Sequence, residues 1–311
     1  MGRTIRIETN DAPVEWFGSA LSMPLRSRDT GGLVSVQAAT VRPGAATPPH
    51  AHGREDEAFW IIAGTLTVRV GRGEALRLGA GDFVYVPRGH VHAVANESDQ
   101  PVTMLTLLSP GAIESAFEAV AADASVARLR AEFGVWGVHV LDAFDPGYSH
   151  PEVPDPAPVI VRRATEGASV WMAGDTYTIK LHGHETGGRF CAVHFDIPPG
   201  GGPLPHIHTL EEEFFHLVDG TLDLLADTAH VRATAGQSVV LPRGIAHAFR
   251  NETDDHVSMY VLAAPAGFDA FITEVGRPAV SGEGPPPMDD AEVARLKATI
   301  ARYGVQLVAG T

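Results

Sequence analysis

The chain repeats itself, and this repeat limits the fold more than any other feature of the sequence. Residues 44–64 read GAATPPHAHGREDEAFWIIAG, and residues 200–220 read GGGPLPHIHTLEEEFFHLVDG, at an offset of 156. A second pair of segments, GDFVYVPRGHVHAVAN at 81–96 and GQSVVLPRGIAHAFRN at 236–251, aligns at an offset of 155. Two long matches at a nearly constant offset indicate a tandem duplication, so we expect one fold to be built twice.

Each repeat predicts short strands separated by tight turns. The segments FWIIAGTLTVRV and FFHLVDGTLDLL each place a glycine between two runs of strand-forming residues. The 311 residues include 33 glycines and 23 prolines, an excess typical of chains with many turns. Apolar residues recur at helical spacing only after each repeat, in residues 112–120, 126–135, 267–275 and 293–303. We therefore expect an all-β fold of two tandem barrels, each followed by short external helices.

A chain of 311 residues is long enough for two domains, each with its own core. The segment DPGYSHPEVPDPAP, which ends at residue 158, opposes regular structure because of its prolines. We place an N-terminal domain at 1–145, a proline-rich linker at 146–158 and a C-terminal domain at 159–311.

Composition excludes several classes of partner and site. The formal net charge is −15 and no basic run is present, so we expect no binding to nucleic acid or to an anionic membrane. No apolar stretch approaches the length of a membrane span, and the first residues show no secretory signal, which favours the cytoplasm. Cys191 is the only cysteine, so an internal disulfide and a thiolate metal site are excluded.

Histidines and a glutamate recur in both repeats with the spacing of metal ligands. His50 and His52 are two residues apart, so on a strand both side chains face the same way. Glu57 begins the next predicted strand, and His92 follows the turn at 87–89. In a barrel these four side chains can converge. The second repeat carries the same set: His206, His208, Glu213 and His247.

Three imidazoles and one carboxylate suit a divalent first-row metal ion. We therefore predict one such ion in each barrel. Iron is the first choice, and manganese, nickel, cobalt or copper are the alternatives. Asn96 and Asn251 end strands beside the predicted ligands, and we expect them to bond to the backbone instead of the metal.

Both repeats resemble the two motifs of the cupin superfamily. The first motif, G-x5-H-x-H-x4-E-x6-G, is carried by Gly44, His50, His52, Glu57 and Gly64, and again by Gly200, His206, His208, Glu213 and Gly220. The second, G-x5-P-x-G-x2-H-x3-N, is carried by Gly81, Pro87, Gly89, His92 and Asn96, and again by Gly236, Pro242, Gly244, His247 and Asn251. The chain thus resembles a bicupin, which implies two tandem jelly-roll barrels. The segment PPHAHGREDEAF, the TGG loops and the ARYGV tail resemble bacterial quercetin 2,3-dioxygenase-like bicupins.

This resemblance implies a metal-dependent dioxygenase whose partners are a small aromatic substrate and dioxygen. In such enzymes a flavonol hydroxyl binds the metal, the ligand glutamate takes its proton, and the ring opens with loss of carbon monoxide. Glu57 and Glu213 are therefore the predicted catalytic bases. The first barrel matches the family pattern more closely than the second, which favours it as the catalytic one. A homodimer is an open option.

Three other functions remain open from the sequence. The first is an oxygenase that acts on an aromatic polyketide or a quinol in secondary metabolism, by hydroxylation or ring opening. The second is an oxalate decarboxylase-like enzyme, because oxalate decarboxylase is also a bicupin with the same ligands. The third is a non-catalytic metal-binding cupin. The ligands alone do not separate these functions.

Overall fold

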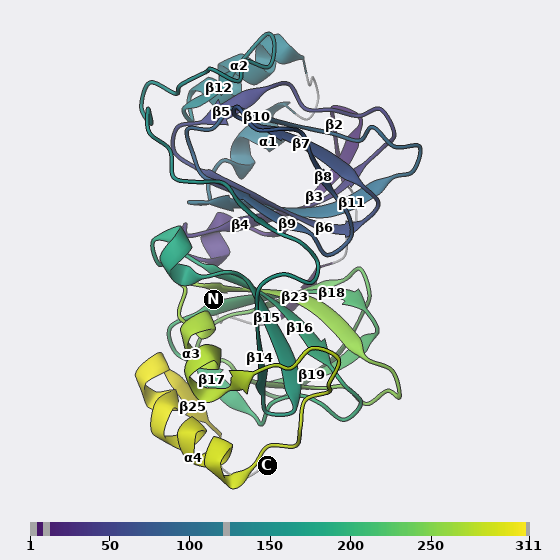
Figure 1. Cartoon of the computed structure of the whole chain (residues 1–311), viewed down its shortest axis with the longest axis vertical. Helices are drawn as coiled ribbons and strands as arrows, with labels where there is room; N and C mark the ends of the chain where they lie inside the picture. The colour runs from purple at the N-terminus through teal and green to yellow at the C-terminus, as the bar shows by residue number, and fades with distance from the viewer. Residues whose placement is uncertain (1–4, 9–12, 121–124, 309–311) are drawn as a thin grey trace. The chain divides into compact units, whose positions relative to one another are not determined.

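A computed structural model describes residues 5–8, 13–120 and 125–308. The chain divides into two compact units. The unit of residues Asn10–Thr165 is called the N-terminal barrel below. The unit that begins at Glu166 is called the C-terminal barrel, and it also includes the described N-terminal residues 5–8. As predicted, the fold is mostly β, with two tandem barrels (Figure 1).

The N-terminal barrel consists of two antiparallel sheets. The larger sheet has the strand order β13-β9-β6-β11-β4-β3-β2, and the smaller has the order β12-β5-β10-β7-β8. The strands are β2 (Val14–Trp16), β3 (Ser19–Leu25), β4 (Ser35–Val41), β5 (His50–His52), β6 (Asp56–Ala63), β7 (Leu66–Val70), β8 (Leu76–Leu78), β9 (Phe83–Val86), β10 (His92–Ala95), β11 (Val102–Ser109), β12 (Val138–Val140) and β13 (Ile160–Arg162).

The C-terminal barrel repeats this arrangement. Its larger sheet has the order β1-β21-β18-β23-β16-β15-β14-β24, and its smaller sheet has the order β20-β19-β22-β17-β25. The strands are β1 (Arg6–Glu8), β14 (Ala168–Met172), β15 (Asp175–Leu181), β16 (Cys191–Ile197), β17 (His206–His208), β18 (Glu212–Asp219), β19 (Thr221–Ala226), β20 (Ala229–Thr234), β21 (Ser238–Leu241), β22 (Ala246–Arg250), β23 (Val257–Ala264), β24 (Arg277–Pro278) and β25 (Val305–Leu307).

Each barrel has its own apolar core between its two sheets. Phe59 and Ile61 of β6 belong to the core of the N-terminal barrel, and Phe215 and Leu217 of β18 belong to that of the C-terminal barrel. These residues alternate with residues on the opposite face, as a strand requires. The turn after β6 needs glycine, because Gly64 has a φ of +83° and an added Cβ would lie 2.7 Å from the Pro101 carbonyl oxygen.

Short helices follow the strands of each barrel, as the apolar spacing predicts. They are α1 (Glu114–Val120), α2 (Val126–Gly134), α3 (Phe268–Val275) and α4 (Asp290–Thr299). In the described part of the chain, 3-10 turns add to them: η1 (Ser27–Asp29), η2 (Gly183–Thr186) and η3 (Ile300–Tyr303). In the C-terminal barrel α3 and α4 pack together beside β17 and β25 (Figure 1). Within the described ranges no helix is both long enough and apolar enough to cross a lipid bilayer.

Two short strands extend the large sheets. Strand β13 follows the predicted linker 146–158, yet it pairs with β9 inside the N-terminal barrel, with Ile160 opposite Tyr85. Strand β1, near the start of the chain, pairs with β21 of the C-terminal barrel. The boundary between the two units in the sequence lies between residues 165 and 166, a few residues beyond that linker. The proline-rich composition predicts the loop correctly. It does not predict that a three-residue strand will pair beside it, because that pairing needs a sheet edge that exists only after folding.

Candidate metal centres

The predicted ligands of the N-terminal barrel come together from both sheets. His50 and His92 lie directly opposite each other on the neighbouring strands β5 and β10. His52 follows two residues after His50, so its side chain lies on the same face of β5. Glu57 comes from β6 in the other sheet. The site therefore exists only because the two sheets of the barrel face each other.

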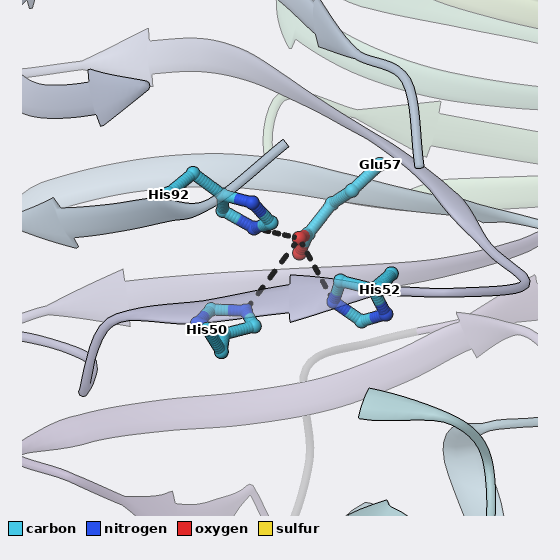
Figure 2. Close-up of side chains that lie close together, drawn as sticks. All are labelled: His50, His52, Glu57 and His92. Atoms are coloured by element: carbon cyan, nitrogen blue, oxygen red, sulfur yellow. Dashed lines mark hydrogen bonds and ion pairs between the residues drawn. The ribbon is translucent and has the colours of Figure 1, made fainter. Parts of the chain in front are cut away.

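The four side chains point toward one centre (Figure 2). Oε2 of Glu57 lies 2.7 Å from Nε2 of His92, 3.4 Å from Nε2 of His52 and 3.9 Å from Nε2 of His50. One ligand atom from each residue lies within 4.8 Å of all the others. Opposite ligands of a transition-metal ion lie about 4.2 Å apart, so this spacing is close to that of an occupied site.

The outer nitrogens of these histidines contact acceptors that orient each ring. Nδ1 of His50 donates to the Pro48 carbonyl at 2.8 Å, and Nδ1 of His92 contacts the His90 carbonyl oxygen at 3.1 Å. Nδ1 of His52 contacts Oε2 of Glu55 at 3.3 Å. When the proton is held on Nδ1, Nε2 is unprotonated and can offer its lone pair to a metal ion at the centre.

The pKa values of His50 and His52 shift in opposite directions. Burial, together with the neighbouring His92 and His52, lowers the pKa of His50 to about 3. Burial disfavours the charged form of His52, but the nearby carboxylates of Glu55 and Glu57 outweigh it and raise the pKa to about 9. Burial also opposes ionisation of Glu57, yet the neighbouring His52 and His92 hold its pKa well below the usual range. A metal ion would replace the proton on His52, so binding should release protons.

The residues fit a divalent metal ion. His92 faces acceptor oxygens at both ring nitrogens, although a neutral imidazole carries only one N–H. Nε2 of His52 is buried without a hydrogen-bond partner. A cation between the imidazoles and the carboxylate would satisfy both atoms, since buried polar groups rarely stay unpaired. Three nitrogen donors and one oxygen donor suit a first-row transition metal.

The second cluster comes from the equivalent strands of the C-terminal barrel, and its carboxylate lies farther from the imidazoles. His206 on β17 lies opposite His247 on β22. Nε2 of His206 and Nε2 of His208 are 3.1 Å apart, and the three imidazoles have ligand atoms within 4.8 Å of one another. Oε2 of Glu213 lies 3.0 Å from Nε2 of His247 and 3.6 Å from Nε2 of His208. Glu213 does not join the group that meets the mutual 4.8 Å spacing, unlike Glu57.

The second cluster also contains buried polar atoms without partners. Nε2 of His247 and Oε2 of Glu213 approach each other but make no hydrogen bond. Burial, together with His247 and His208, lowers the pKa of His206 to about 3. Burial opposes ionisation of Glu213, but nearby His208 and His247 lower its pKa to about 2. This cluster therefore also fits a divalent ion, with Glu213 as the ligand that has to move furthest.

Two further carboxylates support the clusters, and the sequence reading missed them. Glu55 is 3% exposed and contacts Nδ1 of His52, whereas Glu211 is 2% exposed and lies 3.5 Å from Nδ1 of His208. A carboxylate behind a ligand histidine fixes its ring and raises its basicity. The repeat holds a signal for this role, because Glu55 and Glu211 align at the same offset as the ligands.

The second repeated motif also positions two asparagines that bond to the backbone. Nδ2 of Asn96 donates to the carbonyls of Val41 and Gln100 at 2.9 and 2.8 Å, and Nδ2 of Asn251 donates to those of Ile197 and Asp255 at 3.0 and 2.8 Å. The prediction that both asparagines bond to the backbone is thus confirmed.

A cavity opens beside each cluster. The cavity of the N-terminal barrel has a volume of about 60 Å³ and is lined by His50, His52 and Glu57 together with Trp16, Phe59 and Phe133 among others. The cavity of the C-terminal barrel has a volume of about 200 Å³ and includes His206, His208, Glu213 and His247 in its wall. Five phenylalanines line it as well: Phe195, Phe215, Phe249, Phe268 and Phe271. Each cluster therefore borders an apolar space.

Comparison with known families finds the cupin domain twice. A family profile described as Cupin domain matches residues 38–108 and residues 193–263. The two matches lie one in each barrel and include all eight predicted ligands.

Matches to curated proteins are short. Residues of this chain are 34% identical over 68 residues to the tetracenomycin polyketide synthase protein TcmJ of Streptomyces glaucescens, covering 22% of this chain and 45% of that protein. The chain spans less than half the length of the curated relatives it matches.

Solved structures match over most of the chain at low identity. Oxalate decarboxylase of Bacillus subtilis, described with Mn(II) centres, is 16% identical with a TM-score of 0.59, covering 86% of this chain and 79% of that one. Protein YlbA of E. coli is 12% identical with a TM-score of 0.59, covering 84% of this chain and 90% of that one. At these identities the likeness supports the two-barrel fold alone.

Proposed function

We propose that this chain, which carries two cupin domains in tandem, is a metal-dependent oxygenase of a hydroxylated aromatic compound or enol, such as a flavonol. The observation that carries the proposal is the position of a three-histidine, one-glutamate cluster in the wall of an apolar, aromatic-lined cavity. The histidines can hold a transition metal, and the cavity can hold an organic ring. Quercetin 2,3-dioxygenase-like chemistry combines these two requirements.

A bound divalent ion of a redox-active metal would supply Lewis acidity toward a substrate hydroxyl and electron transfer with dioxygen. The glutamate of the cluster is ionised, and its Oε2 can accept the proton of a hydroxyl that a bound metal ion would make more acidic. The phenylalanine walls exclude water and position a flat ring by contact with its faces. The carbonyls behind His50 and His206 and the Glu55 carboxylate behind His52 hold the imidazoles in place during this proton transfer.

A cavity without cationic side chains argues against a small dianion as the substrate. Among the described residues that line the two cavities beside the clusters, none is lysine or arginine. The metal ion would be the only cation near a dicarboxylate such as oxalate, and the rest of its charge would lose hydration against apolar walls, which is costly. The oxalate decarboxylase-like alternative is therefore the weaker one, although the fold and the metal ligands are compatible with it.

Aromatic polyketide chemistry is the second candidate. The identity of 34% to the tetracenomycin polyketide synthase protein TcmJ over 68 residues favours it. Aromatic polyketides also carry hydroxylated rings. Both candidates use the same cluster and the same apolar cavity. They differ in the reaction product, because flavonol cleavage releases carbon monoxide and hydroxylation does not.

The test combines metal analysis with oxygen consumption. Elemental analysis of purified protein should find a redox-active transition metal, and oxygen uptake should accompany conversion of a flavonol or a polyketide phenol from a substrate panel. Carbon monoxide release would then assign flavonol cleavage. Zinc as the sole metal would contradict the oxygenase proposal, because zinc has no redox chemistry. Protein loaded with iron or manganese that consumes no oxygen with any member of the panel would favour a non-catalytic binding role.

A further inference from the structure

The two barrels share a ligand set but differ in the space beside it. The cavity of the C-terminal barrel, at about 200 Å³, is more than three times the volume of the N-terminal one, at about 60 Å³. An apolar cavity of about 150 Å³ accepts a benzene ring, whereas a smaller one holds only a few water molecules. By this measure the C-terminal cavity admits a substituted six-membered ring and the N-terminal cavity does not.

Three aromatic side chains narrow the N-terminal cavity. Trp16 of β2, Phe117 of α1 and Phe133 of α2 form a packed cluster that lines it. The ring centroids of Trp16 lie 4.7 Å from Phe117 and 5.5 Å from Phe133, and the two phenylalanines are 4.9 Å apart. Such contacts fix all three rings in place.

The equivalent positions of the C-terminal barrel are aliphatic. The repeat aligns Trp16 with Met172, the tail segments align Phe133 with Ile300, and the first helices align Phe117 with Ile272. Met172 and Ile300 line the larger cavity. The smaller side chains leave more room at these positions of the fold, whereas the same alignment places larger ones elsewhere in the C-terminal wall, such as Phe271 where the N-terminal barrel has Ala116.

The C-terminal cavity also has a tyrosine in its wall and an apolar entrance. Tyr177 lines it, where the N-terminal barrel has Leu21, and its hydroxyl donates to Oδ2 of the buried Asp175 at 3.4 Å. Leu204, Met288 and Leu307 line the same cavity and remain 61%, 37% and 38% exposed. Large apolar side chains that are both exposed and part of a cavity wall mark an opening that an apolar ligand can use.

We propose that the C-terminal cavity is the organic-ligand site of the chain, that it takes one hydroxylated ring of the substrate with that hydroxyl toward His206, His208 and His247, and that Trp16 closes the equivalent site of the N-terminal barrel. The assignment rests on the proposed function for the choice of a hydroxylated ring. It makes Met172 and Ile300 the specificity-determining residues. The N-terminal cluster then holds a metal without an organic ligand.

The test exchanges the cavity residues between the barrels and measures binding of 4-nitrocatechol to the metal-loaded protein by its visible absorbance. Wild-type protein should bind about one probe molecule per chain. The Met172→Trp/Ile300→Phe variant should bind it at least tenfold more weakly, because the two new side chains occupy the cavity. The matched control, Trp16→Met/Phe133→Ile, should keep the original binding, and a second bound probe would further support the role of Trp16.

Metal content measured on each variant shows whether both barrels stay folded. If Met172→Trp/Ile300→Phe fails to fold, Leu296→Trp on α4 narrows the same cavity from another element and should give the same loss. Unchanged probe affinity in a folded cavity-filling variant would overturn the assignment, as would loss of binding in the Trp16→Met/Phe133→Ile control. These readouts do not involve oxygen. Absence of oxygen consumption with every substrate would therefore remove the proposed function and leave the ligand site in place.

Discussion

The N-terminal and C-terminal barrels carry the same metal-binding motif in different surroundings. In the N-terminal barrel four ligand atoms lie within 4.8 Å of one another, but three aromatic rings leave a cavity of only about 60 Å³. In the C-terminal barrel only the three imidazoles reach that spacing, and the cavity is about 200 Å³. Ligand geometry and access for a substrate are thus set by different residues. Agreement with a ligand motif does not by itself show which barrel is catalytic.

The largest expected effect tests whether both clusters bind metal. His92→Ala and His247→Ala each remove one imidazole from a four-ligand set, so each should lower the metal content by about one ion per chain, from about two. Elemental analysis after dialysis measures this. If His247→Ala keeps both ions, His247 is not a metal ligand, and the C-terminal site is not built like the N-terminal one.

The second effect separates the catalytic roles. A general base contributes about 10²–10⁴-fold to rate. If the C-terminal cavity binds the substrate, Glu213→Gln should lower the turnover of a confirmed substrate by that factor at matched metal content, and Glu57→Gln should cost much less. The closer family match of the first barrel favours the reverse order. Steady-state oxygen uptake by the two variants decides between these predictions, and equal losses would mean that both barrels react.

The third effect concerns the carboxylates behind the ligands. Glu55 hydrogen-bonds to Nδ1 of His52, whereas Glu211 lies 3.5 Å from His208 without forming a hydrogen bond. Glu55→Gln should therefore weaken metal binding in its barrel by about 10–100-fold, and Glu211→Gln should weaken it less. Competition with a chelator measures both affinities, with the exposed Glu74→Gln as a control. Equal effects would show that bound metal draws Glu211 into the same role.

The smallest effect is the pH dependence that Asp175 gives to the stability of the C-terminal barrel. Burial raises the pKa of Asp175 to about 7, against the opposing hydrogen bond from Tyr177, and the equivalent N-terminal residue is Ser19. The folded carboxyl binds its proton more tightly than the unfolded one. Its contribution to stability is therefore complete below pH 4 and is lost as the pH rises through about 7.

Asp175→Asn should consequently raise the free energy of unfolding by a few kcal/mol at pH 8, about 1.4 kcal/mol for each unit of pKa shift at most. The advantage over wild type should shrink toward pH 4. Urea unfolding at both pH values measures the difference. A stability difference that stays constant across this range would show that Asp175 is ionised in the folded protein.

Much of the metal centre is readable from the sequence because its geometry is local and repeated. The alternation of a strand puts His50 and His52 on one face, and the constant offset predicts the second set. The cupin domain matches and the two-barrel structure agree with the predicted all-β fold. Glu55 and Glu211 could have been found from the same offset. Each lies two residues before a ligand glutamate, and this spacing does not show whether such a carboxylate binds the metal or orients a histidine.

The size of each cavity was decided by the tertiary structure. Trp16, Phe117 and Phe133 are far apart in the chain, and only the closed barrel brings their rings within 5.5 Å of one another. Likewise β13 and β1 become strands only once β9 and β21 offer free edges. Residue type and spacing specify which donor atoms a strand presents. The volume left beside those atoms depends on how side chains from separate elements pack, and that is not a property of any single segment of sequence.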